Sequence, residues 1–485
     1  MLFTSYRFLL FFTSLFVLYW IFGRKSVKVQ NGLLLVFSYL FYGIAEWRML
    51  PLLIVATIVF YWLGIKIDKS NNIHSRKIFT HIGVLLGIGV LLYFKYFNFF
   101  IESFAYFFDT IGIHTNIHTF NILMPLGVSY FTFKLISYVL EVERWKMEAT
   151  KNFVDFAVYV SFFPTIMAGP IDRPNKFIPQ LQSPRVFSIE SGIDGGQQII
   201  WGLFKKVLIA DNLSPIIDGV WENMSNYSGS TLVFALFLYT IQMYADFSGY
   251  SDMAIGVSKL LGIRIAKNFN YPFFATNIKE FWQRWHISLT GWLTDYVFTP
   301  LHIRFRDLGN FGMILAIIIN MVLVGMWHGA NWTYAVFGLY QGLLFIPIIL
   351  KGKMHKKQKL QTTILGLPKF VDICKMFGVV CLYAIGIILF RAENLGQSWE
   401  MIRGICNLSI FSLPQILTHK VQWLLSVFFI LVITEWYNRD REYAIQPLSY
   451  SLKSIIPYIL IDYILLFFVI FKGNVGANSF IYFQF

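Results

Sequence analysis

Apolar residues form long blocks along most of the chain, and short polar stretches separate these blocks. A helix needs about 20 mainly apolar residues to cross a bilayer, and lipid-exposed backbone must satisfy its own hydrogen bonds. The pattern therefore predicts an all-α, polytopic integral membrane protein with about 11 to 14 membrane segments, some of them re-entrant or interfacial. The expected segments are 8–22, 32–46, 50–65, 79–97, 123–140, 153–168, 230–247, 311–326, 333–350, 374–390, 423–437 and 456–471, with 193–220 and 249–265 as weaker candidates.

The composition excludes a soluble globular protein. Of the 485 residues, 56% are hydrophobic and only 14% are charged, whereas soluble domains carry about a quarter charged residues. No internal repeat or soluble appendage is visible, so we predict one membrane domain over 1–485, with its core motifs in 124–342 and C-terminal helices in 374–485. Three cysteines without paired spacing predict neither a disulfide nor a metal site.

The formal charge of +14 comes from basic residues that gather in short loops between the apolar blocks, at 24–28, 66–77 and 351–357. Cytoplasmic loops of membrane proteins carry such an excess of Lys and Arg, which faces anionic lipid head groups. The basic charge therefore indicates the lipid bilayer as a partner and argues against nucleic acid. If 24–28 is cytoplasmic, alternation places the N-terminus outside and the loops at 66–78 and 141–152 inside.

Aromatic residues recur at helical spacing within the segment 268–301, NFNYPFFATNIKEFWQRWHISLTGWLTDYVFTPL. Asn277 and Glu280 have the spacing of a capping box and predict that a helix begins there. We expect one amphipathic helix along which Trp282 and Trp285 share a stripe, with His286 at its edge. Such helices lie at an interface or line a cavity. His286 is either a functional residue or an interfacial anchor beside Trp residues.

A second histidine, His328, lies within or at the end of an apolar helix, next to Trp327 in GMWHGANW. An imidazole is costly to bury in a membrane unless it is partnered, so such a residue is a functional candidate by default. The structural alternative is a histidine that packs between helices. We expect Asn331, three residues later, to reach the ring from the same helical face.

Three charged residues near these segments allow two interpretations each. Asp246 and Asp252 flank FSGYS. They would line a tunnel or contact a cofactor, or they would satisfy backbone amides freed at a broken helix, which we favour. Arg284 would bind the phosphates of a donor such as coenzyme A, or it would extend to the lipid head groups.

Several ordered blocks together resemble the membrane-bound O-acyltransferase (MBOAT) family, in its alginate and peptidoglycan O-acetyltransferase branch. The matching blocks include MPLGVSYFTFKLISYVLEV (124–142), FFPTIMAGPIDRPNKFIPQL (162–181), the two histidine segments and the final FIYFQF (480–485). The resemblance covers most of the chain. It departs at Gln341, where many members carry His, and at His302, where Gly is frequent.

The resemblance implies a ring of helices in the bacterial cytoplasmic (inner) membrane, with the family's near-invariant histidine at His328 and its second position at His286. It implies an acetyltransferase that takes acetyl groups from a cytoplasmic thioester, with acetyl-CoA as donor, and passes them outward for O-acetylation of a cell-envelope polysaccharide. It also implies an extracytoplasmic serine-hydrolase-like (SGNH) partner. A neutral histidine can act as general base for the attacking hydroxyl, and an acetyl-histidine intermediate is the alternative.

Other functions remain open at this point. The acceptor is alginate-like exopolysaccharide or peptidoglycan, and D-alanyl transfer to teichoic acid is the second enzymatic candidate. A glycan or lipid flippase without chemistry would have equally many spans and interior charges, although no inverted repeat is visible. A scaffold that only anchors a secreted transferase is the third possibility.

Overall fold

The computed structural model describes residues 1–24, 26–113, 119–354, 356, 362–363 and 366–474. Within these ranges the chain is helical, and no strand forms beyond one isolated bridge between Thr362 and Pro368. The predicted all-α class is confirmed. In chain order the α-helices are α1 (Tyr6–Gly23), α2 (Val27–Glu46), α3 (Leu50–Lys69), α4 (Ile73–Leu91), α5 (Phe97–Thr110), α6 (Val128–Glu143), α7 (Phe153–Ser161), α8 (Phe163–Ile166), α9 (Pro174–Leu181), α10 (Ile189–Leu203), α11 (Asp211–Glu222), α12 (Gly229–Leu260), α13 (Ile278–Arg284), α14 (Ile287–Leu293), α15 (Thr299–Arg304), α16 (Gly309–His328), α17 (Trp332–Leu343), α18 (Ile346–Leu350), α19 (Phe370–Arg391), α20 (Leu395–Ile405), α21 (His419–Tyr437) and α22 (Leu452–Lys472).

Many of these helices are long and apolar enough to cross a membrane. The described ranges contain nine such stretches, which confirms a polytopic, multi-pass membrane protein. One of them joins α2 and α3 into a stretch of 43 residues, about twice the length that a single crossing needs. The stretches are Tyr6–Gly23, Val27–Lys69, Ile73–Thr110, Gly229–Leu260, Arg306–His328, Trp332–Leu350, Phe370–Arg391, His419–Tyr437 and Ser454–Lys472.

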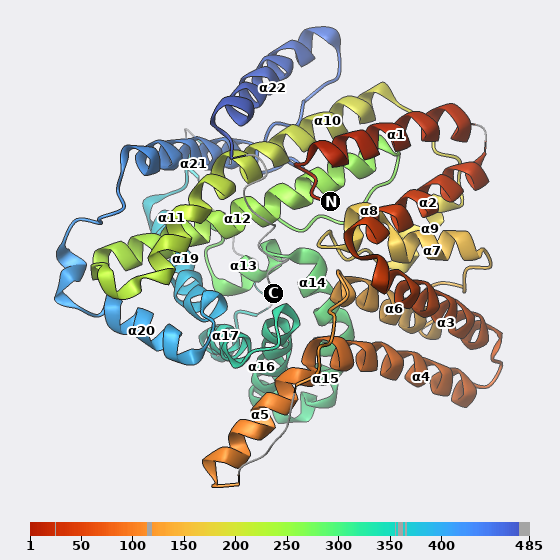
Figure 1. The fold of residues 1–485 in the computed structure, drawn as a ribbon, viewed down its shortest axis with the longest axis horizontal. Helices are drawn as coiled ribbons and strands as arrows, with labels where there is room; N and C mark the ends of the chain where they lie inside the picture. Colours follow the sequence, from red (N-terminus) through yellow and green to blue (C-terminus); the bar gives the residue numbers. More distant parts are fainter. Residues whose placement is uncertain (25, 114–118, 355, 357–361, 364–365, 475–485) are drawn as a thin grey trace. The chain divides into compact units, whose positions relative to one another are not determined.

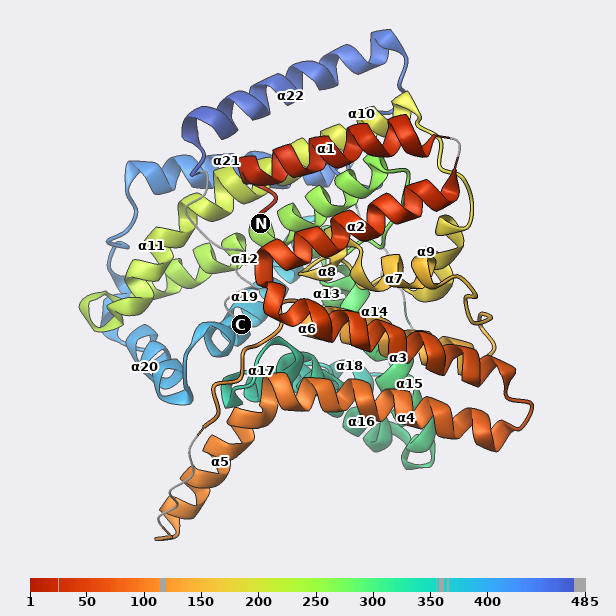
Figure 2. The same ribbon diagram turned by 45° about the vertical axis from the view of Figure 1, so that its right-hand side comes forward.

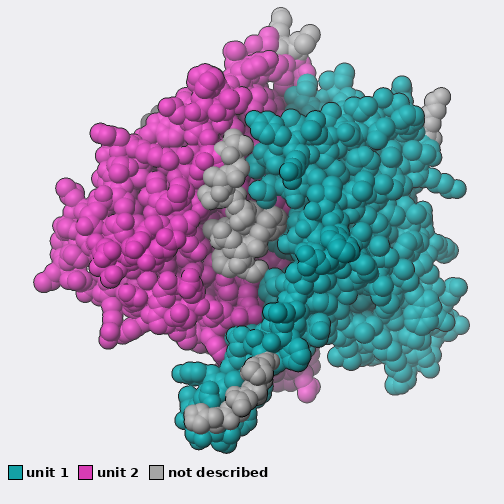
Figure 3. Space-filling model, in the orientation of Figure 1, with its two compact units in different colours: residues 1–195, 254–266 teal, residues 196–253, 267–485 magenta. Residues whose placement is uncertain are grey.

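The helices form two compact units, drawn in different colours in Figure 3. Unit 1 comprises residues 1–195 and 254–266, and unit 2 comprises residues 196–253 and 267–485. Both α10 and α12 begin in one unit and end in the other, so the chain passes between the units within helices. That the whole chain acts as one membrane domain stays a prediction.

In unit 1, α1 lies beside α2 and α3 lies beside α4 (Figures 1 and 2). Helix α6 packs between α3 and α4 and is buried along almost its whole length, so it lies inside the unit and not against lipid. The guanidinium of Arg76 donates hydrogen bonds to the carbonyl oxygens of Ile67 (2.9 Å) and Glu143 (3.1 Å). The predicted cytoplasmic loops at 66–78 and 141–152 therefore lie close together where Arg76 joins them. The side of the membrane that they face stays a prediction.

The predicted segment 153–168 is not one continuous helix, and whether it crosses the membrane stays a prediction. This stretch forms two short helices, α7 and α8, which are separated at Phe162. Pro164 lies in the first turn of α8, where its missing N–H group costs nothing, whereas within a continuous helix it would remove a backbone hydrogen bond. The apolar residues are instead buried inside unit 1.

The predicted helix break at FSGYS is also wrong. Helix α12 runs without interruption from Gly229 to Leu260. A Cβ atom on Gly249 would lie 2.7 Å from the carbonyl oxygen of Gly202 on α10, which is closer than a carbon can approach. The glycine therefore permits close packing of two helices and does not interrupt one.

Helices α16 and α17 form a tight hairpin that carries His328 at its turn. A Cβ atom on Gly325 would lie 2.1 Å from the carbonyl oxygen of Tyr334, and one on Gly338 would lie 2.3 Å from that of Met321. Both close approaches involve backbone atoms, which cannot move away as a flexible side chain can. The two glycines therefore set the distance between the helices, and with it the position of His328.

We predict that Gly325→Ala lowers the thermal stability of the protein in detergent by about 1–3 kcal/mol, because the added methyl group overpacks the hairpin. The matched control is Gly378→Ala in α19, where no atom lies within 4 Å of the new Cβ. This control should be neutral or slightly stabilising, because alanine favours helix more than glycine does. Equal melting temperatures for the two variants would contradict the packing described for Gly325.

Candidate functional site

His286 lies in a sharp break between two short helices. Helix α13 ends at Arg284, α14 begins at Ile287, and His286 has φ 45° and ψ 51°, in the left-handed region. The single continuous helix expected across this segment is therefore wrong, although its predicted start is confirmed. The Asn277 side chain accepts from the Glu280 backbone N–H (2.9 Å), and the Glu280 carboxylate accepts from that of Thr276 (2.9 Å). We call residues 284–287 the His286 elbow.

The preceding extended segment holds the elbow on both sides. The backbone N–H of Asn270 donates to the carbonyl of Arg284 (2.9 Å), and the N–H of Ile287 donates to the carbonyl of Asn268 (2.8 Å). The two hydrogen bonds run in opposite directions, as in a short antiparallel pair. They satisfy backbone groups that the interrupted helix leaves without helical partners.

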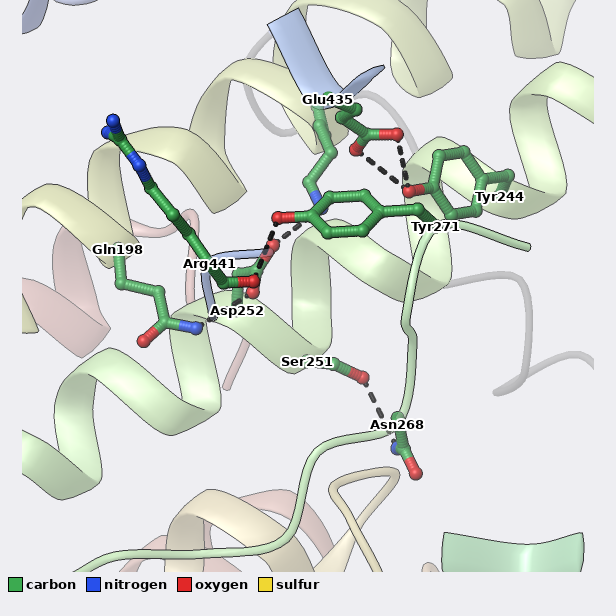
Figure 4. A network of polar contacts seen from close by, with 9 residues as sticks. Gln198, Tyr244, Ser251, Asp252, Asn268, Tyr271, Glu435 and Arg441 are labelled. Atoms are coloured by element: carbon green, nitrogen blue, oxygen red, sulfur yellow. Dashed lines mark hydrogen bonds and ion pairs between the residues drawn. The ribbon is translucent and has the colours of Figure 1, made fainter. Parts of the chain in front are cut away.

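The side chain of Asn268 connects the elbow to α12, as Figure 4 shows for Asn268 and Ser251. Its amide nitrogen donates to the Ser251 hydroxyl (3.3 Å), and its amide oxygen accepts from the Ser288 hydroxyl at the start of α14 (2.5 Å). Asn268 itself is fully buried. One buried amide therefore ties α12 and α14 to the segment that pairs with the elbow.

The two candidate histidines meet inside unit 2. The ring centroids of His286 and His328 lie 6.2 Å apart, and the exposed fractions of the two residues are 1% and 5%. His328 is the last residue of α16, which confirms its predicted place at the end of an apolar helix. Burial lowers the pKa of His286 to about 3, so this imidazole is neutral at physiological pH.

Aromatic rings surround the histidine pair. His286 lies edge-on to Phe247 (4.6 Å between centroids) and to Trp327 (5.6 Å), and His328 lies edge-on to Phe390 (5.0 Å). Trp285 is buried on the far side of the elbow and stacks on Phe281 (5.5 Å). Of the two predicted tryptophans, Trp327 contacts both imidazoles and Trp285 supports the elbow.

Asn331 and Arg284 make local contacts. The prediction that Asn331 shares a helical face with His328 is wrong, because α16 ends at His328. The Asn331 side chain accepts from the Thr333 backbone N–H at the start of α17 (3.1 Å) and donates to the Glu393 carbonyl (2.7 Å). Arg284 forms an ion pair with Glu280 (2.8 Å) and donates to the Asn270 carbonyl (3.0 Å). A role for either residue in substrate binding stays a prediction.

Asp246 belongs to a set of buried ion pairs on α12. Its carboxylate lies 2.7 Å from the Lys206 ammonium, which also binds Asp211 (2.8 Å). The neighbouring Lys205 binds Asp252 (2.5 Å). These pairs replace the predicted contacts of Asp246 and Asp252 with freed backbone amides.

Both lysines lie in a π-helical turn, Phe204–Ala210, between α10 and α11. The sequence analysis did not predict these two lysines as part of the site. Their position inside the apolar stretch IIWGLFKKVLIA is nevertheless a usable signal. Buried cations need anionic partners, so such lysines indicate ion pairs.

A second unpredicted contact lies next to the elbow. The Tyr244 hydroxyl donates to the carboxylate of Glu435 in α21, with 2.8 Å to each oxygen, and Figure 4 shows this pair beside Asp252 and Tyr271. The Tyr244 ring packs against Phe269 (5.8 Å) and Trp285 (6.3 Å). Tyr244 therefore carries a buried hydrogen bond on one side and supports the elbow on the other. The described residues contain no group of three or more His, Cys, Asp or Glu side chains that could hold a metal.

Residues 39–384 match the sequence model of the membrane-bound O-acyltransferase family, and this match includes both histidines. The chain belongs to this family. It shares 35% identity with the "probable alginate O-acetylase AlgI" of Azotobacter vinelandii, over 94% of this chain and 88% of that protein. Identity with the "peptidoglycan O-acetyltransferase" of Helicobacter pylori is 30%, over 78% and 74% of the two chains. The "teichoic acid D-alanyltransferase" of Bacillus subtilis matches at 33%, over 49% of this chain and 62% of that protein.

Membership of this family makes the protein an O-acyltransferase. It confirms the resemblance on which the histidine assignment was based, and it removes the support for a flippase or a scaffold without chemistry. The roles of the individual site residues stay predictions, which the geometry of the elbow allows us to test.

We predict that Asn268→Ala lowers acyl transfer by more than its effect on stability explains, because the elbow loses its connections to Ser251 and Ser288. Initial rates and melting temperatures would be measured on the same purified samples. Asn223→Ala is the matched control, since Asn223 is exposed and its side chain binds only its own helix, at the Gly219 carbonyl (3.1 Å). A rate unchanged from that of the control would show that the elbow does not need this amide.

The pKa of His286 predicts a pH dependence of stability. The folded-state pKa of about 3 lies below the unfolded value of about 6.5, so the unfolded state binds the proton more readily and stability falls as pH drops below about 6.5. Between pH 7 and pH 5 the free energy of unfolding of the wild type should fall by about 2 kcal/mol more than that of His286→Asn. The asparagine side chain does not titrate, and asparagine tolerates positive φ. Thermal unfolding in detergent at both pH values measures this difference, and parallel losses would contradict a buried neutral His286.

Proposed function

We propose that this protein transfers acetyl groups from a cytoplasmic thioester, acetyl-CoA, for O-acetylation of a cell-envelope polysaccharide on the outer side of the cytoplasmic membrane. The observation that carries the proposal is the pair of buried histidines, 6.2 Å apart between ring centroids, within the region that matches the family. Relatives named for alginate and peptidoglycan O-acetylation match most of the chain. An alginate-like exopolysaccharide and peptidoglycan are therefore the acceptors to test first.

His328 acts as the general base in this proposal. Its neutral imidazole takes the proton of the acceptor hydroxyl as the hydroxyl oxygen attacks the carbonyl carbon of the thioester. The carbon–sulfur bond then breaks, and the protonated imidazole returns the proton to the leaving thiolate. The products are the acetyl ester and the free thiol, and His328 is neutral again. Such assistance by a positioned base contributes roughly 10²–10⁴ in rate.

His286 has a different role because its environment keeps it neutral. An imidazole with a pKa near 3 is a weak base, so His286 is poorly suited to accept the proton itself. We assign it to positioning: it lies beside Trp327, which also contacts His328 (5.1 Å between centroids). A neutral ring also avoids repulsion when His328 becomes positively charged.

The direction of transfer requires a donor and an acceptor on opposite sides of a membrane. The basic loops at 66–77 and 141–152 lie together and mark the expected cytoplasmic side. The acetyl group leaves on the other side, either directly to the polysaccharide or through an extracytoplasmic serine-hydrolase-like partner of the SGNH type. Reconstituted vesicles with labelled acetyl-CoA on one side would show which face gains the label.

D-alanyl transfer to teichoic acid is the second candidate. The relative named for that reaction matches 49% of this chain, whereas the alginate relative matches 94%. The difference favours acetyl transfer. Supplying either labelled acetyl-CoA or a labelled D-alanyl carrier protein to the purified protein distinguishes the two donors.

We predict that His328→Ala reduces acetyl transfer from labelled acetyl-CoA by about 10²–10⁴-fold while leaving the protein folded and in the membrane. His328→Gln should be equally inactive, because a glutamine hydrogen-bonds but cannot accept the proton. The control is His419→Ala, at the exposed start of α21, which should keep wild-type activity. If His328→Ala retained most of its activity, His328 would not be the base.

A further inference from the structure

An apolar pocket of about 480 Å³ opens in unit 2 on a face formed by α12, α19 and α21. Its floor is buried: Phe274, Met376 and Trp436 are exposed by only 5–7%. Its rim is exposed, with Phe377 at 63% and Phe429 at 65%. The pocket is lined by Phe237, Thr240, Ile241, Phe273, Phe274, Leu367, Pro368, Ile373, Met376, Phe377, Val380, Phe428, Phe429, Val432, Ile433, Trp436 and Tyr437.

The polar hydrogens of Thr240 and Trp436 in this pocket are already bonded within the protein. The Thr240 hydroxyl donates to the Leu236 carbonyl of its own helix (3.0 Å), and the Trp436 indole N–H donates to the Gly366 carbonyl (2.9 Å). A polar ligand would lose its hydration here without replacement hydrogen bonds. A hydrocarbon chain loses no hydrogen bonds to water when it enters the pocket, so the lining selects an apolar occupant.

The position of the pocket identifies the source of such a chain. Helices α12, α19 and α21 are all long and apolar enough to cross the membrane, so an opening on their outer side faces lipid acyl chains and not water. The rim near the Trp436–Gly366 hydrogen bond also carries cations. The Arg439 guanidinium lies 4.5 Å from the centroid of the Trp436 ring, and Lys369 is exposed at the start of α19.

Not all charges at this rim are positive. Asp440 follows Arg439 and is exposed, whereas Asp372 is neutralised by its ion pair with Lys375 (2.8 Å). A phosphate group placed on the bilayer surface meets Arg439 and Lys369 when its acyl chain enters the pocket, because both cations lie next to residues of the lining. A phospholipid combines an apolar chain with such a phosphate.

We propose that this pocket binds one acyl chain of a membrane phospholipid, whose phosphate contacts Arg439 and Lys369. The bound acyl chain supports the His286 elbow through the aromatic residues that lie between the pocket and the elbow. Phe273 lines the pocket and packs against Tyr244 (4.7 Å between centroids), and Tyr244 packs against Trp285 of the His286 elbow (6.3 Å). The supporting role depends on the proposed function, whereas binding of the lipid does not.

The test is native mass spectrometry of the full chain in a mild detergent, titrated with dioleoyl phosphatidylglycerol, dioleoyl phosphatidylethanolamine or dioleoylglycerol. The wild type should retain one phospholipid that survives detergent washing, and dioleoylglycerol, which lacks the phosphate, should bind more weakly. Met376→Trp fills the floor and should abolish retention. Arg439→Gln should weaken it about fivefold, the effect of one interfacial cation.

The matched control is Ile430→Trp, which adds the same side chain to an exposed position of α21 (61% exposed) that does not line the pocket. It should retain lipid as the wild type does. If Met376→Trp does not fold, Val432→Phe makes the same test with a smaller change. Equal retention by wild type and the filled variants would overturn the site, and equal binding of dioleoylglycerol would overturn the phosphate contact.

Acyl transfer is measured separately on the same samples. A filled variant that loses both lipid and activity, with His328 intact, supports the link between the pocket and the elbow. A filled variant that loses lipid but keeps activity overturns that link and leaves the proposed function unaffected. Conversely, an inactive His328→Ala protein should still retain the phospholipid.

Discussion

The site depends on how an interrupted helix satisfies its backbone where water is scarce. A break such as that at Trp285 and His286 removes helical hydrogen bonds, and each unsatisfied buried group costs several kcal/mol in an apolar medium. Asn268 and Asn270 supply the two missing partners, and the Asn268 side chain ties them to α12. The elbow can therefore hold a histidine at positive φ in a buried position, which a regular helix does not allow.

The buried charges of unit 2 also need partners, because water is scarce around them. Lysines 205 and 206 lie in a π-helical turn that faces α12, and each finds a carboxylate of α12 within 2.7 Å. Removal of either lysine would leave a buried carboxylate without its cation, which is strongly destabilising. Gly202 and Gly249 bring the two backbones close enough for these pairs to form. The carboxylates of α12 thus hold the neighbouring π-helical turn in place.

Sequence patterns predicted the parts of this protein that depend on periodicity and composition. Most of the apolar blocks, the start of α13 at Asn277 and the end of α16 at His328 are confirmed, because hydrophobic length and capping residues act locally. The predictions that failed concern local structure that is determined by contacts between residues far apart in the sequence. The sequence suggests that Gly249 breaks a helix, but this glycine permits close helix packing. The pattern of Trp282 and Trp285 predicts one helix, but the chain turns at an elbow that Asn268 and Asn270 hold through backbone hydrogen bonds. Lys205 and Glu435 have partners far away in sequence, which one sequence does not reveal.

The two histidines occupy different local environments although they lie close together. His286 lies on the elbow, enclosed by Phe247 and Trp327, and burial leaves it too weak a base to accept a proton at neutral pH. His328 ends α16, at the negative end of the helix dipole. A base at a helix C-terminus and a neutral neighbour on a broken helix therefore suit the two roles proposed for them.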